Sequence, residues 1–136
     1  MQACDVYMRG DTIYIFSSAE THNGLRLASE PMLKLDAHSP PQTIGAAIIR
    51  ALEAAQSGAP APNDMRAITH GILKFARVKS WKAFVMGARY FFIAWDGARV
   101  EIIPGVPAKG GAFLHDPTRT AHCALDAAAI GKIILR

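Results

Sequence analysis

Residues 79–105 read KSWKAFVMGARYFFIAWDGARVEIIPG and hold the densest apolar and aromatic content of the chain. Gly87 and the pair Asp96-Gly97 are turn signals in this stretch. Asp-Gly suits a two-residue type I′ turn, because both central residues of that turn need a positive φ. The stretch therefore predicts three strands, at Trp81–Met86, Tyr90–Trp95 and Arg99–Ile103.

The last two of these strands differ in their pattern. Tyr90–Trp95 is apolar on both faces, so we expect an interior strand that is covered on both sides. Arg99–Ile103 alternates, with Val100 and Ile102 facing inward, as an antiparallel strand with one solvated face does. This part of the chain indicates a sheet rather than a helical bundle.

The rest of the chain adds more strands and a few helices. Helical periodicity begins after Ser39-Pro40-Pro41-Gln42, where Ser39 is the expected N-cap, and it runs from Ile44 to Ala55. A second helix is predicted at Met65–Ala76 and a third from Ala127, capped by Asp126. Further strands are predicted at Cys4–Met8, Thr12–Ser18, Leu25–Ala28, Met32–Leu35 and Thr118–Leu125. The predicted fold class is α+β, a largely antiparallel sheet with two or three packed helices in a single domain, 1–136.

Two pairs of segments resemble each other within the chain. Residues 8–16 match residues 85–93 in pattern, and residues 44–50 match residues 130–136. These matches predict an internal repeat of a strands-then-helix unit, at 1–57 and 78–136, bridged by the helix around 64–76.

Composition limits the class of protein. Hydrophobic residues make up 51% and charged residues 19% of the 136 residues, which is typical of a globular domain. The sequence has no apolar run near the roughly 18–20 residues that span a bilayer, so we expect a cytoplasmic protein. Cys4 and Cys123 lie in apolar, strand-like segments and are expected to be buried thiols rather than a disulfide.

The net charge of +4 is unevenly distributed. Residues 1–60 carry four Lys and Arg against six Asp and Glu, whereas residues 61–136 carry eleven against five. No acidic residue lies between Asp64 and Asp96, and the stretch Arg66–Arg89 is basic. This stretch also contains Trp81 and Phe84, which allows two interpretations. Either its cations bind phosphates while the aromatics stack on bases, or the aromatics belong to the core and the cations are simply solvated. We favour the second interpretation.

Histidines are the only residues with an unperturbed pKa near neutrality. His115 and His122, together with Lys132 or Lys79, would be the acid, base and phosphate ligand of a metal-independent ribonuclease. A zinc set of His115, Asp116, His122 and Cys123 lacks the usual ligand spacing. The chain contains none of the common nucleotide-binding, hydrolase or metalloprotease motifs. We therefore expect no catalytic residue, no cofactor and no metal.

The segment Leu73–Phe84 (LKFARVKSWKAF), followed by Gly87-Ala88, resembles the CdiI family of immunity proteins from bacterial contact-dependent growth inhibition systems. Gly110–Phe113 and Ala129–Gly131 fit the same pattern, so the resemblance extends over about residues 68–136. The chain departs from the family in its basic charge balance and in a final helix that is shorter by one turn.

The resemblance implies a bacterial, cytoplasmic binding protein that is not an enzyme. Its partner would be the toxic C-terminal domain, frequently a nuclease, of a cognate CdiA-type toxin, and neither a membrane nor nucleic acid is expected as a partner. We expect the loops at 17–23 and 30–38 to face the toxin. The predicted toxin-binding residues are Glu20, His22, Glu30, Asp36 and His38.

Two alternatives from other classes of protein remain open. The first is a ribonuclease-type enzyme or toxin that uses His115 and His122, and it requires both histidines on one face. The second is a nucleic-acid-binding module that uses the basic stretch 66–89, and its binding would depend on salt concentration.

Overall fold

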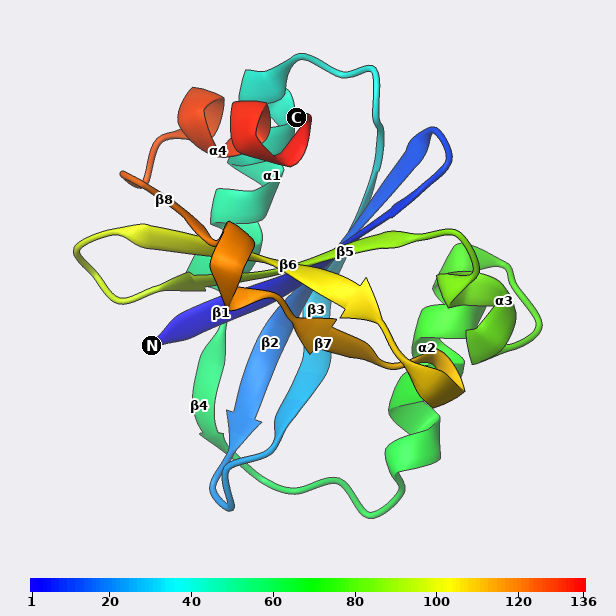
Figure 1. Cartoon of the computed structure of the whole chain (residues 1–136). Helices are drawn as coiled ribbons and strands as arrows, with labels where there is room; N and C mark the ends of the chain where they lie inside the picture. Colours follow the sequence, from blue (N-terminus) through cyan, green and yellow to red (C-terminus); the bar gives the residue numbers. More distant parts are fainter.

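The computed structural model describes all 136 residues and contains one eight-stranded sheet with four α-helices (Figure 1). This confirms the α+β class, with one helix more than the two or three predicted. The strands are β1 (Gln2–Arg9), β2 (Thr12–Thr21), β3 (Arg26–Asp36), β4 (Gln56–Ala59), β5 (Arg89–Trp95), β6 (Val100–Pro107), β7 (Phe113–His115) and β8 (Ala121–Cys123). The helices are α1 (Pro41–Glu53), α2 (Met65–Ala76), α3 (Trp81–Val85) and α4 (Ala127–Ile134).

The sheet is antiparallel except at one short strand. Its order is β3-β2-β1-β5-β6-β7, with β8 also paired to β6 and with β4 parallel to β2. β5 lies between β1 and β6, which confirms the predicted interior position, but the predicted cover on both sides is incomplete, because Phe92 on the second face is only half-buried. Val100 and Ile102 of β6 are buried as predicted. β3 forms one edge of the sheet.

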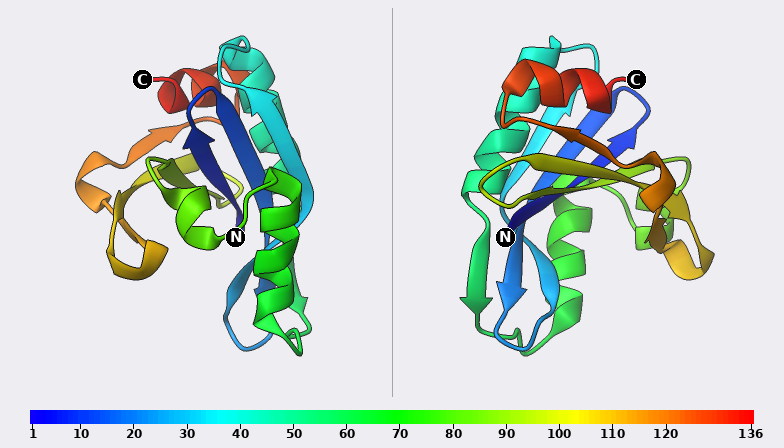
Figure 2. Two further views of the ribbon diagram at one scale, coloured as in Figure 1. Left: turned by 90° about the vertical axis from the view of Figure 1, so that its right-hand side faces the viewer. Right: turned by 60° about the vertical axis from the view of Figure 1, so that its left-hand side comes forward.

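Each face of the sheet carries its own hydrophobic core. On the first face, α1 and α4 pack against apolar side chains of β1, β2, β5 and β6, including Val6, Ile15 and Ile93. On the second face, α2 and α3 cover an aromatic cluster centred on Tyr7, Phe16 and Phe84. Figure 2 shows α1 and α4 together at one end of the molecule, away from α2 and α3. The sheet thus separates two cores of different chemistry, one aliphatic and one aromatic.

The helices α1 and α4 cross in backbone contact. A Cβ atom on Gly45 of α1 would lie 1.7 Å from the carbonyl oxygen of Ala127, and one on Gly131 of α4 would lie 1.9 Å from that of Pro41. Real Cβ atoms do not approach backbone atoms so closely, so only glycine fits at either position. The two contacts are reciprocal, because Gly131 and Ala127 each follow their counterparts by 86 residues. The internal repeat itself stays a prediction.

The predicted strand at Trp81–Met86 is wrong, because Trp81–Val85 forms the short helix α3. Ser80 caps this helix, and its side chain accepts a hydrogen bond from the amide of Ala83. The spacing of Trp81, Phe84 and Val85 is that of one helical face, and all three contact the aromatic cluster. A period near 3.6 was thus mistaken for an apolar strand.

Several element boundaries also differ from the predictions. Leu25–Ala28 and Met32–Leu35 belong to one continuous strand, β3, while the predicted strand Thr118–Leu125 shrinks to β8 after a 3₁₀ turn at Pro117–Arg119. β4 was not predicted at all.

Of the predicted helix caps one is confirmed and one is wrong, and the type of the predicted turn is also wrong. Ser39 does not cap α1, whose N-cap is Pro40 without a side-chain hydrogen bond, whereas Asp126 caps α4 as predicted. The turn at Asp96-Gly97 exists, but only Gly97 has a positive φ, so it is not type I′. The carboxylate of Asp96 instead accepts hydrogen bonds from the amides of Ala98 and Arg99.

We predict that Gly45→Ala and Gly131→Ala each lower the free energy of unfolding by at least about 2 kcal/mol, because the added methyl forces two helix backbones apart. Chemical denaturation followed by circular dichroism measures the change. Gly71→Ala in α2 is the matched control, since a Cβ there meets only the terminal methyl of Met32 at 3.9 Å. The control should gain about 0.5–1 kcal/mol from helix propensity. Equal effects at the three sites would contradict the crossing as a determinant of stability.

Candidate protein-binding surface

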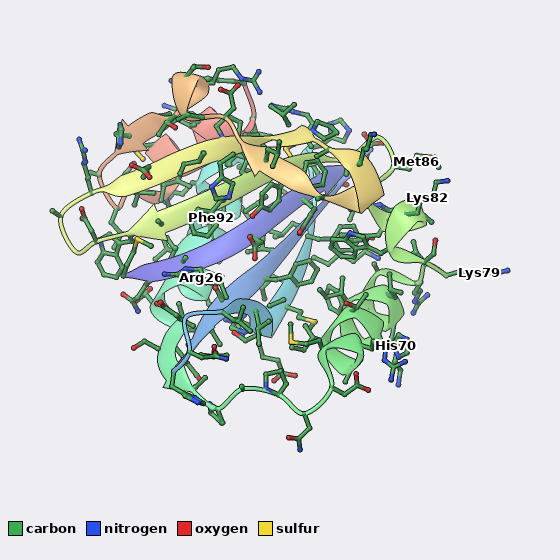
Figure 3. The ribbon with its side chains drawn as sticks, turned by 60° about the horizontal axis from the view of Figure 1, so that its bottom comes forward. Arg26, His70, Lys79, Lys82, Met86 and Phe92 are labelled. Atoms are coloured by element: carbon green, nitrogen blue, oxygen red, sulfur yellow. The ribbon has the colours of Figure 1, made fainter.

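The helices on the second face of the sheet leave part of that face open. α2 and α3 cover the side chains of Tyr7, Tyr14 and Phe16, but not the neighbouring part where Asp5 and Phe92 lie side by side in register. Figure 3 views this face and shows Arg26 and Phe92 on it, apart from α2 and α3. We call this region the open patch, and it is made of Asp5, Glu20, Arg26, Phe92 and His115.

A half-buried carboxylate lies at the base of the open patch. Asp5 accepts a hydrogen bond from the hydroxyl of Tyr90, and burial raises the pKa of Asp5 above its ordinary value. That hydrogen bond and the positive charges of His115 and Arg26 oppose the rise. Burial, followed by the charge of Asp5, raises the pKa of Tyr90 in turn. A buried acid with a shifted pKa costs stability, and such groups gather at functional sites.

The ring of Phe92, with a histidine and an arginine beside it, forms the exposed part of the patch. The ring of His115 stacks on that of Phe92 with centroids 5.0 Å apart, and the guanidinium of Arg26 lies 5.9 Å from the Phe92 centroid. Arg26 also forms an ion pair of 3.3 Å with Glu20 across the β2–β3 pair. Partly exposed aromatic and arginine side chains held on strands are the residue types that dominate binding energy in protein interfaces.

The structure places four of the five predicted toxin-binding residues in two groups, one at each end of β3. Glu20 belongs to the open patch, and His22 follows it in the adjacent turn, with Nδ1 3.3 Å from the carbonyl oxygen of Ala59. Asp36 and His38 lie at the opposite end of β3, where Asp36 accepts a hydrogen bond from the His38 amide. Ten residue steps along a strand correspond to about 33 Å, so the two groups are not one cluster.

The remaining predicted residue and its neighbours lie on the edge of the sheet. Glu30 is exposed on β3, between the two groups. At the far end of the strand, His38 Nε2 lies 3.2 Å from a carboxylate oxygen of Asp11. The prediction of loops at 17–23 and 30–38 is wrong for most of these residues, because Ser17–Thr21 belongs to β2 and Glu30–Asp36 to β3. The two segments form a long rim, of which only the Glu20 end adjoins the open patch.

The two histidines of the ribonuclease alternative lie on the same sheet face. His115 pairs with Gly105 and His122 with Glu101 along β6, a four-residue offset that corresponds to about 13 Å. His122 Nε2 lies 3.1 Å from a carboxylate oxygen of Glu101, and His115 is stacked on Phe92. An acid and a base that act on one phosphate must both reach it within hydrogen-bond distance, which this spacing does not favour.

The lysines of that alternative lie elsewhere. Lys132 belongs to α4, on the first face of the sheet, and Lys79 lies in the connection between α2 and α3. The structure therefore does not bring the four predicted ribonuclease groups together.

The basic stretch 66–89 forms the outer surface of α2 and α3. Phe84 is fully buried and Trp81 donates its indole N–H to the carbonyl oxygen of Gly111 at 2.9 Å, so both aromatics serve the core, as we favoured. Figure 3 shows His70, Lys79 and Lys82 extending into solvent, with the exposed Met86 beside them. Neither Trp81 nor Phe84, the two aromatics of the nucleic-acid alternative, is therefore available to stack on bases.

No group of three or more His, Cys, Asp and Glu side chains is arranged to hold a metal ion. Cys4 is buried, Cys123 is half-buried, and both are free thiols, as predicted. None of the helices is both long and apolar enough to cross a membrane.

Comparisons with known proteins identify the fold. A scan against protein-family models and a search of curated proteins both found no match. Among solved structures, the chain is similar to a protein of unknown function from Neisseria meningitidis, with a TM-score of 0.80, 13% identity and coverage of 98% of this chain and 92% of that one. It is also similar to a chain of the CdiA-CT/CdiI toxin and immunity complex from Yersinia pseudotuberculosis, with a TM-score of 0.73, 10% identity and coverage of 98% and 95%. The chain therefore has a fold found in a toxin–immunity complex.

Sequence reasoning missed most of the open patch. Of its five residues, only Glu20 was predicted to bind the toxin, and His115 was considered for a different role. The missed signal was Asp5, the single carboxylate within the apolar strand Cys4–Met8. Arg26 and Phe92 carried no signal of their own, since their proximity depends on the register of β1, β2, β3 and β5.

We predict that Asp5→Asn raises the melting temperature at pH 7. Because burial raises the pKa of Asp5 in the folded state, the folded protein holds more protons than the unfolded chain between the ordinary value of 3.8 and the raised one. The free energy of unfolding should therefore fall as pH rises through that window. Asparagine carries no charge but keeps an oxygen that accepts from Tyr90, so its advantage should vanish below pH 3.8. Thermal melts from pH 3 to pH 8 measure this dependence.

Glu53→Gln, at an exposed carboxylate of α1, is the matched control and should show no such pH-dependent gain. A stability of Asp5→Asn that is equal to or lower than that of the unaltered protein at pH 7 would show that the buried charge is not a cost to the fold.

Proposed function

We propose that this chain is an immunity protein that binds and neutralises the toxic C-terminal domain of a cognate CdiA-type contact-dependent growth inhibition toxin in the bacterial cytoplasm. The observation that carries the proposal is the fold, which matches a chain of a toxin and immunity complex over 98% of this chain. The resemblance of residues 68–136 to the CdiI family supports it independently. The role requires binding alone, and we propose no catalytic group.

The open patch supplies what such binding requires. A specific interface covers about 800 Å² on each partner and gains most of its energy from a few anchors near its centre. Phe92 and Arg26 are such anchors, and both lie on strands, which hold side chains more precisely than loops do. Glu20 and His22 adjoin them, so we propose that the toxin contacts this end of β3 most closely. Glu30, Asp36 and His38 are proposed as a secondary contact along the rim.

The first test is size-exclusion chromatography of this protein mixed with the C-terminal domain of the toxin encoded directly upstream. We expect a stoichiometric complex, with loss of any nuclease activity that the toxin domain shows alone. Separate elution at micromolar concentrations, with full toxin activity, would reject this pairing. Cleavage of tRNA by the protein alone would instead support the ribonuclease alternative.

The second test locates the surface by calorimetric titration of variants with the toxin domain. The pair Arg26→Ala and Phe92→Ala should weaken binding by at least about 30-fold, since removal of an anchor typically costs 2 kcal/mol or more. The double variant Glu20→Ala/His22→Ala should weaken toxin binding more than the double variant Asp36→Ala/His38→Ala. Lys132→Ala, on the opposite side of the sheet, is the control and should bind normally. If alanine at all five predicted residues leaves the affinity unchanged, those residues do not contact the toxin.

A further inference from the structure

A second surface follows the outer edge of β3 and differs in chemistry from the open patch. Here β3 and α2 border a hollow of about 720 Å³, which adjoins another of about 650 Å³ that continues towards the end of α1. The two hollows share Glu30, Met32 and Phe75, so they form one groove. Glu30 is the only residue that this groove shares with the surfaces proposed to bind the toxin.

The floor of the groove is apolar. Met32 and Phe75 are partly buried against the aromatic core and partly open to the groove, and Pro31 and Leu33 continue the floor along β3. Gly71 of α2 also lines it, and the missing side chain leaves room there. The Phe75 ring makes T-shaped contacts with the rings of Tyr14 and Phe16. The floor therefore suits an aliphatic or aromatic side chain of a ligand.

The rim of the groove is strongly cationic. Four exposed basic side chains surround it against a single carboxylate, Glu30, and none of the five takes part in an ion pair. The four cations are Lys34, Arg50, Lys74 and Arg77. Positive charge that is not neutralised within the chain attracts an anionic partner and speeds its encounter.

Arg77 has an unusual backbone conformation. It ends α2 with φ 58° and ψ 44°, and it is the only residue other than glycine with a positive φ. Glycine is the usual residue at this position of a helix, because the left-handed conformation brings a Cβ atom too close to the following carbonyl oxygen. Strained residues often occur at functional sites, so the strain of Arg77 at the mouth of a cationic groove supports a functional role for its side chain.

From this groove we propose that the chain carries a docking site for an acidic segment of a partner protein, with an apolar side chain of that segment between its carboxylates. The apolar side chain would lie on Met32 and Phe75, while the carboxylates pair with Lys34, Lys74 and Arg77. An acidic peptide fits better than nucleic acid, because the floor offers a single aromatic ring, Phe75, and not a series of rings on which successive bases could stack. The site does not depend on the proposed immunity function.

The test uses fluorescence anisotropy with a panel of labelled 12-residue peptides that alternate Asp or Glu with Leu, Phe or Met. A matched panel carries Lys in place of every acid. We expect the acidic peptides to bind at least tenfold more tightly than the lysine peptides, and to weaken as salt is raised. Lys74→Glu with Arg77→Glu should lower the affinity at least tenfold. Lys132→Glu, the same kind of charge change on α4, should have little effect.

Two single substitutions separate a binding role from a structural one. Arg77→Gly relieves the strained backbone, so it should raise the melting temperature of the protein while it lowers the affinity for the acidic peptides. Glu30→Gln removes the opposing charge and should strengthen their binding by several-fold.

Failure of the acidic panel to bind, or equal binding of the two panels, would overturn the proposal. Tighter binding of a 12-nucleotide single-stranded RNA than of the acidic peptides, lost in the same variants, would replace the acidic protein with nucleic acid as the partner.

Discussion

The antiparallel pairing of β1 with β5 is the constraint on which the rest of the structure depends. It joins the first strand of the chain to a strand more than 80 residues later, in a continuous register from Gln2 opposite Trp95 to Met8 opposite Arg89. Each partner then continues the sheet outward on its own side, through β2 and β3 or through β6, β7 and β8. A one-residue slip would move the side chains of one strand to the opposite face of the sheet and mix the aliphatic and aromatic cores. The same register places Asp5 beside Phe92, so the open patch is a direct consequence of this pairing.

The sequence allowed the prediction of those elements that local patterns control. The stripe of α1, the cap of α4 and the two apolar faces of β5 are local signals, and the structure agrees with all three. α3 shows where local patterns are ambiguous, because five residues rich in apolar side chains satisfy a strand and a single helical turn equally well. β4 could not be predicted, since it exists only because β2 offers a parallel partner to a segment with weak strand propensity.

The binding surfaces were harder to predict than the elements. Glu20, His22, Glu30, Asp36 and His38 were predicted from polar, turn-like segments, and the structure spreads them along the length of the β2–β3 hairpin. The open patch combines side chains of five strands, and the groove combines β3 with helices α1 and α2. Proximity of this kind depends on register and on helix packing, which a single sequence does not contain. Only the surplus of positive charge in the second half of the chain pointed towards part of the groove.

The separation of the two cores has an optical consequence. The protein has two tryptophans, and Trp81 packs in the aromatic core of the second face, whereas Trp95 packs against the aliphatic core of the first. Each core therefore contains one intrinsic fluorophore. The rings of Tyr7 and Phe84 lie beside Trp81, whose indole N–H donates to the Gly111 carbonyl oxygen, so the emission of Trp81 reports on the α3 side of the sheet. The emission of Trp95 reports on the side of α1 and α4. With one tryptophan replaced by phenylalanine, the fluorescence of the other would follow unfolding on its own side of the sheet. Comparison of the two variants would show whether the two sides unfold together or in sequence.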